Sequence, residues 1–272
     1  MKKIAAIFSL FIICQLSACS NHQQNWTETN TLDRNQLANL QVAPIRYDNA
    51  NPVLSQLRIK SLQDSAMSIG AQSGLAYASE QINADLLRNR KNLQTIYNFY
   101  ALVLDHGVIP PILAEGNNSL NLDDPNTIRI VDKTYKIVAQ ARFATTPPNW
   151  REYLWMSFNR PELPDRTLLP KSNEEQAIWR RGIMIGWDKG VQQAYSIFQQ
   201  NLARLKRDYN GMLLYRKLLA AKMISPPFVA RTELGITGDG SDMRINDQVL
   251  RIVELPQLQT NSQRWQATVV TK

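Results

Sequence analysis

The chain has 272 residues, of which 44% are hydrophobic and 20% charged, and its formal net charge at pH 7 is +8. That length is enough for one large domain or two small ones with a packed core. Acidic residues lie among the basic ones and aromatic residues do not alternate with them, which excludes a nucleic-acid platform and indicates a solvated surface. The two cysteines, Cys14 and Cys19, both lie near the N-terminus, so the body must be held together by packing rather than by disulfides.

Residues 1–18 have the order of a secretory signal peptide. Two lysines precede an apolar run, Ile4–Ile13, that is too short to cross a bilayer. Small residues then lead to a cysteine in Leu16–Cys19, which is typical of a bacterial lipoprotein signal. Cleavage would leave Cys19 as the new N-terminus, and several acyl chains on one residue anchor a protein stably. Because Ser20 rather than an aspartate follows, we expect the protein at the outer membrane, facing the periplasm.

The segment that follows, residues 19–52, is predicted to be a lipidated, flexible lead. It is rich in Asn, Gln and Thr and holds few core-forming residues. Such a lead would let a globular body stand away from the membrane. Folding is expected to begin near Val53.

The sequence of the body contains an internal repeat. Identical residues recur in order and nearly without gaps at a shift of 116 residues, or of 115 towards the end. This predicts an internal duplication, with a first repeat and an aromatic junction at 53–170 and a second repeat at 171–272. The matches include Gly70 with Gly186, Gly74 with Gly190, Pro110-Pro111 with Pro226-Pro227, Arg129-Ile130 with Arg244-Ile245, and Trp150 with Trp265.

The spacing of apolar residues predicts a long amphipathic helical stretch in each repeat, at Leu54–Leu104 in the first and at Glu174–Lys222 in the second. Consecutive prolines end both helical stretches. A helix of about 50 unbroken residues would be unusual, so we also expect a break inside each stretch, after Arg88–Lys91 in the first and near Tyr209–Gly211 in the second. The Gly-x-x-x-Gly of each stretch predicts close packing of helices inside the body, since the surrounding charges exclude a membrane pair.

Extended chain follows each helical stretch and is expected to form a small antiparallel hairpin, so the predicted fold class is α+β, with the same arrangement in both duplicated halves. The residues between the expected strands suit tight turns. The strands expected are Thr127–Val131 with Tyr135–Phe143 around Asp132-Lys133, Met243–Ile245 with Val249–Glu254 around Asn246-Asp247, and a last one at Trp265–Val270.

Residues for catalysis are sparse. His106 stands alone and reads as a helix cap, and no spacing of ligands indicates a metal site. Glu80 and Glu115 are the candidate carboxylates for cutting a glycan, but their counterparts in the second repeat are not carboxylates. We therefore predict no enzyme and no cofactor beyond the covalent lipid on Cys19.

Aromatic residues supply the candidate interface. Tryptophan beside arginine is favoured at the centres of protein interfaces, and three of the five residues lie in the segment between the repeats. Core packing is the competing interpretation, and that segment could instead fix the relative orientation of the repeats. The five residues are Trp150, Tyr153, Trp155, Trp179 and Trp187.

Six stretches of the body, taken together and in order, are quite specific: Ile69–Ala76, Val108–Ile112, Asn149–Leu154, Glu175–Trp179, Arg207–Met212 and Ile245–Asp247. With the lipobox Leu16–Cys19, they resemble the DotC lipoprotein family, called TraI in conjugative plasmids of the type IVB class. The resemblance covers nearly the whole chain.

The resemblance implies a structural role in the outer-membrane core complex of a type IVB secretion or conjugation machine. It implies two partners, a second lipoprotein of the DotD type and a secretin-like protein of the DotH type, and it brings no catalytic residues. An anchor at Cys19 would keep neighbouring copies at high effective concentration, so ring-forming self-association is expected. The alternative is a lipoprotein that binds or cleaves peptidoglycan on its own.

Overall fold

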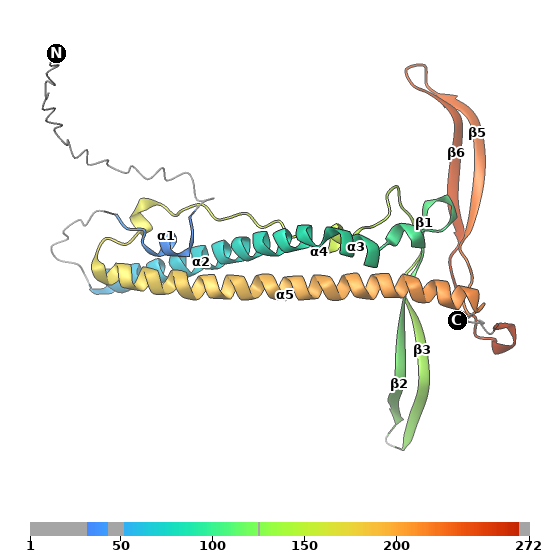
Figure 1. The fold of residues 1–272 in the computed structure, drawn as a ribbon, viewed down its shortest axis with the longest axis horizontal. Coiled ribbons are helices and arrows are strands. Elements are labelled where there is room, and N and C mark those ends of the chain that lie inside the picture. The colour runs from blue at the N-terminus through green and yellow to red at the C-terminus, as the bar shows by residue number, and fades with distance from the viewer. Residues whose placement is uncertain (1–31, 43–51, 125, 267–272) are drawn as a thin grey trace, which may run out of the picture.

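The computed structural model describes residues 32–42, 52–124 and 126–266. Two long helices, α2 (Pro52–Arg88) and α5 (Asn173–Ala220), lie side by side and run in the same direction (Figure 1). Three shorter helices lie along this pair: α1 (Arg34–Ala38), α3 (Arg90–Ile96) and α4 (Trp150–Leu154) (Figure 1).

Two long hairpins leave one end of the helix pair in opposite directions (Figure 1). Each is a separate antiparallel sheet of two strands, and a third small sheet joins two very short strands. The pairs are β2 (Ile112–Asp124) with β3 (Thr127–Ala139), β5 (Phe228–Gly238) with β6 (Met243–Glu254), and β1 (Val108–Ile109) with β4 (Arg142–Phe143). The predicted α+β fold is confirmed.

The duplication is visible in the backbone. β2 begins at Ile112 and β5 at Phe228, which are 116 residues apart. His106 and Lys222, also 116 residues apart, both take positive φ, at 61° and 54°. The predicted duplication into two halves, each a helix followed by a hairpin, is therefore confirmed.

A seam of glycines brings α2 and α5 into backbone contact. A Cβ added to Gly70 would meet the backbone of Ile183, and one added to Gly186 would meet the backbone of Met67. These contacts are reciprocal under the shift of 116 residues, because Met67 corresponds to Ile183 and Gly70 corresponds to Gly186. The next glycine along each helix repeats the arrangement. The two halves are thus related by an approximate two-fold axis that runs along the helices.

The core follows this helix pair in three clusters. At the end where α2 and α5 begin, Trp179 and Ile183 pack on Leu62. Further along, Trp150 of α4 lies in one buried cluster with Ile82 of α2 and Leu205 of α5. At the hairpin end, Tyr215 packs on residues such as Leu113 at the base of β2.

Part of the lead expected at 19–52 is packed on the body. In α1 and just beyond it, Leu37 and Leu40 are each only 2% exposed. The Trp179 Nε1 donates a hydrogen bond to the Leu37 carbonyl at 2.9 Å, and the Gln176 Nε2 donates one to the Ala38 carbonyl at 2.7 Å. The chain is therefore attached to the body well before Val53. The signal peptide and Cys19 lie outside the described residues.

Two expected breaks have different outcomes. The first is confirmed, since α2 ends at Arg88 and α3 begins at Arg90. The second, near Tyr209–Gly211, is wrong because α5 continues through it. A Cβ on Gly211 would lie 2.6 Å from the Leu113 carbonyl oxygen, so this glycine admits the base of β2 instead of ending the helix.

The expected turns at Asp132-Lys133 and Asn246-Asp247 are wrong, because both pairs lie inside strands, in β3 and β6. Asn246 does have a positive φ of 58°, but the strand resumes after it. The partner strands β2 and β5 were missed. Of the last expected strand, Trp265 is not in a strand, and residues beyond 266 lie outside the described part of the chain.

Candidate interface surfaces

The structure separates the five aromatic candidates by exposure. Trp150, Trp179 and Trp187 are 1%, 0% and 8% exposed and pack inside the chain. Tyr153 is half-buried, and Trp155 is 42% exposed at the end of α4. Of these five rings, Trp155 is the one with a large surface left for a partner.

Tyr153 belongs to a polar cluster that fastens α4 to α5. Its ring stacks on Phe99 with 5.8 Å between centroids, and the Arg204 guanidinium lies 5.2 Å from the Tyr153 centroid. Burial, reinforced by the negative charge of Asp208, raises the pKa of Tyr153 to about 12. Asp208 is itself buried and accepts a 2.8 Å hydrogen bond from Arg207. The phenol thus stays protonated at neutral pH, and the carboxylate is already paired.

A second polar contact joins the two repeats at the opposite end. The Arg58 guanidinium of α2 donates two hydrogen bonds to the Glu175 carboxylate of α5, at 2.5 and 2.9 Å. It also donates to the carbonyls of Thr167 and Leu169. Burial alone would raise the pKa of Glu175, but the hydrogen bonds from Arg58 and from the Lys171 amide outweigh it and lower that pKa.

The two carboxylates considered for glycan cleavage are not brought together. Glu80 of α2 pairs with Arg160 at 2.7 Å, whereas Glu115 of β2 pairs with Lys133 of the neighbouring strand at 3.1 Å. Within the described residues, no three His, Cys, Asp or Glu side chains gather in a way that could hold a metal ion. None of the described helices has the length and apolar character needed to cross a membrane.

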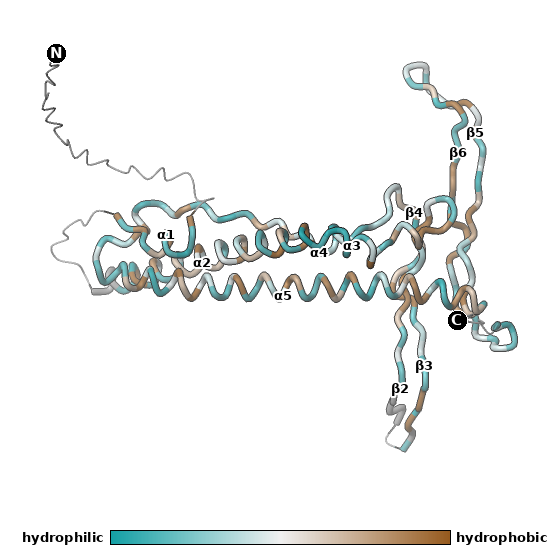
Figure 2. The backbone as a smooth tube through the Cα atoms, in the orientation of Figure 1, coloured by the Kyte–Doolittle hydropathy of each residue, from teal (hydrophilic) through white to brown (hydrophobic). Residues whose placement is uncertain are grey.

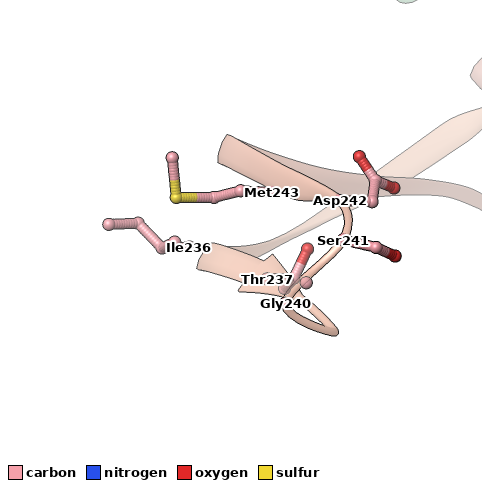
Figure 3. A pocket seen from close by; sticks show the side chains of 7 residues that line it. Ile236, Thr237, Gly240, Ser241, Asp242 and Met243 are labelled. Carbon is pink, nitrogen blue, oxygen red and sulfur yellow. The ribbon is translucent and has the colours of Figure 1, made fainter.

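The hairpins carry surfaces that the sequence analysis missed. Large apolar side chains follow β3, β5 and β6, where Figure 2 shows hydrophobic stretches well away from the helix pair. At the outer end of the second hairpin, a hollow is lined by residues of both strands and the turn (Figure 3). The missed signal is the alternation of apolar and charged residues in Ile128-Arg129-Ile130 and Met243-Arg244-Ile245.

The chain is similar to a known protein family over most of its length. Residues 56–267 match a protein family described as type IV secretory system, conjugal DNA-protein transfer. No curated protein matches the chain. The match covers nearly all of α2, all of α5 and both long hairpins, and it includes the six stretches of the body that carry the resemblance. The chain therefore belongs to the DotC/TraI family of type IV secretion and conjugation proteins.

Proposed function

We propose that this protein is an outer-membrane lipoprotein that serves as a structural component of a type IVB conjugative transfer complex. Acyl chains on Cys19 hold it in the outer membrane with its body in the periplasm. With a second lipoprotein of the DotD type, it helps to place a secretin-like partner of the DotH type at that membrane. The family match over residues 56–267 is the observation that carries the proposal.

Two features of the chain support a role in construction rather than in catalysis. Its paired ionisable groups hold one element to another: Glu175 of α5 pairs with Arg58 of α2, and Glu80 of α2 pairs with Arg160 of the segment before α5. The lipoprotein signal that ends at Cys19 supplies an anchor, and several acyl chains give stable membrane attachment.

The test is a gentle detergent extraction of the tagged protein from cells that carry the whole locus. Size-exclusion chromatography and mass spectrometry then identify what is extracted with it. We expect a large particle that contains the second lipoprotein and the secretin-like protein. A lone monomer bound to cell-wall fragments would defeat the scaffold and favour the peptidoglycan alternative.

Cys19→Ser tests the anchor. We expect the variant to leave the membrane fraction as a folded protein and to abolish DNA transfer. Cys14→Ser is the matched control, because residue 14 belongs to the signal peptide that cleavage would remove. Normal transfer by the Cys19→Ser strain would show that the anchor is dispensable.

A further inference from the structure

The outer halves of both hairpins expose apolar faces. Ile236 of β5 lies directly opposite Ile245 of β6, and Met243 is two residues from Ile245, so the three share one face. They are 70%, 65% and 67% exposed. Ile128 and Ile130 of β3 likewise share a face and are 61% and 72% exposed. We call Ile128 and Ile130 the first tip face, and Ile236, Met243 and Ile245 the second.

The two tip faces are equivalent under the duplication. At the shift of 115 residues, Ile128 falls on Met243 and Ile130 on Ile245. The pairing agrees, since β2 places Leu120 opposite Ile130 just as β5 places Ile236 opposite Ile245. Both repeats thus keep the same exposed positions apolar.

These faces add little to the stability of one chain. Figure 3 shows Ile236 and Met243 extending to the same side of the hairpin end, away from Ser241 and Asp242. Water stays on an apolar side chain that is two-thirds exposed, so the hydrophobic effect is largely unused there. A two-stranded hairpin is marginal alone and gains from packing on another surface. Exposed apolar faces of this kind mark docking sites.

We propose that the tip faces are the lateral contacts between copies of this chain, with the first tip face of one copy packed on the second tip face of the next. The occupant is a second copy because the hairpins leave the body in opposite directions and present equivalent apolar surfaces (Figure 1). Every copy then has one neighbour on each side. A head-to-tail contact of this type closes a ring when its rotation permits.

The area that two tip faces would bury suits a weak contact between subunits that are already confined near one another. The outer half of a hairpin face, about 20 Å long and 10 Å wide, buries about 400 Å² when two such faces stack, which is well below the usual size of a stable interface. Such a contact is weak in dilute solution and strengthens when the copies are confined together. The inference therefore rests on the proposed function, which supplies that confinement.

The test uses Ile130→Cys and Ile245→Cys in the same full-length chain, in cells carrying the whole locus. A bis-maleimide spacer of about 10 Å, the spacing of stacked sheets, joins cysteines on packed faces. We expect a ladder of dimers, trimers and larger products in denaturing gels. Arg129→Cys with Arg244→Cys is the matched control, because these residues lie on the same strands and point to the other face. That control should give no ladder, and the unmodified chain gives the background from Cys14 and Cys19.

The outcomes separate this inference from the proposed function. Extraction from the same cells shows whether the large particle has formed. A particle without a ladder would overturn the lateral contact and leave the scaffold standing. Absence of the particle would defeat the scaffold itself. Two further results would overturn the head-to-tail contact. One is that the cysteines at the tip faces crosslink only to a different protein. The other is that the single variant Ile130→Cys forms a crosslinked dimer, because two first tip faces would then be in contact.

A second pair of variants tests whether the contact matters. Ile130→Asp with Ile245→Asp would place charges in the apolar contact, which is costly. We expect DNA transfer to fall at least about tenfold, which corresponds to about 1.4 kcal/mol. Arg129→Asp with Arg244→Asp is the control and should transfer near the normal rate. Equal transfer by both double variants would overturn the proposal, provided that both proteins reach normal levels.

Discussion

Glu175 shows how one residue links the repeats. Its carboxylate accepts both hydrogen bonds from the Arg58 guanidinium, which in turn donates to two carbonyls of the chain that precedes α5. Planar, bidentate pairs of this kind are stronger than hydrogen bonds between neutral groups. This pair joins α2 of the first repeat to the N-terminal turn of α5.

We expect Glu175→Gln to lower the free energy of unfolding by about 1.5–3 kcal/mol at pH 7, as for hydrogen bonds to charged groups. The folded state lowers the pKa of Glu175 below its ordinary 4.5, so its contribution is complete above pH 4.5 and is lost as the pH falls through the lowered value. Urea unfolding from pH 7 to pH 3 should show the two proteins converging in acid. Glu174→Gln, at the exposed neighbouring position, is the control. A constant difference across that range would contradict the assignment.

At the scale of the elements, the glycine seam controls how closely α2 and α5 approach. We expect Gly186→Ala to destabilise the fold, since the added Cβ would meet the backbone of Met67. Overpacking costs up to about 3 kcal/mol, and the better helix propensity of alanine returns about 1 kcal/mol, which leaves a net loss of about 2 kcal/mol.

Urea unfolding measures that loss, with Gln192→Ala on an exposed position of the same helix as control. The control should change the stability little. Equal midpoints for the two variants would mean that the helices can separate at no cost.

The elements also show what sequence reasoning can reach. Repeated Gly-x-x-x-Gly motifs predicted close helix packing, because missing side chains on one face have a direct physical meaning. β2 was missed since Glu115-Gly116-Asn117-Asn118 has poor strand propensity, and its pairing with β3 depends on tertiary context. The break expected near Tyr209–Gly211 failed for a similar reason, because the contact with Leu113 that explains Gly211 comes from the other repeat.

For the candidate interface, composition alone could not decide between core and surface. A tryptophan is large and apolar in either setting, and only the packed structure shows that Trp179 is buried while Trp155 is exposed. The apolar alternation around Ile130 and Ile245 was present in the sequence. It reads as an ordinary half-buried strand until the structure leaves that face uncovered.

At the scale of the whole molecule, the second hairpin projects away from the helix pair (Figure 1). None of the side chains of β5 and β6 is buried. We therefore expect replacement of residues 233–248 by an Asn-Gly turn to shift the melting temperature by less than about 3 °C, the effect of about 1 kcal/mol in a protein of this size. Calorimetry checks it.

The comparison variant is Leu113→Ala, at the 2%-exposed base of the first hairpin, which should cost about 2–5 kcal/mol. A large loss of stability in the shortened protein would show that the hairpin belongs to the core. A small loss of stability would show that the exposed apolar residues of the second hairpin do not serve the fold, which leaves assembly as their role.

The reciprocal contacts of Gly70 with Ile183 and of Gly186 with Met67 are those of a symmetric helix dimer joined in one chain. A chain of half the length that met its own copy along those glycines would form a parallel homodimer with exact two-fold symmetry. In the present chain the two halves differ, since one helix breaks at Arg88 while the other continues to Ala220. Any ring built from this chain would therefore carry twice as many long hairpins as polypeptides.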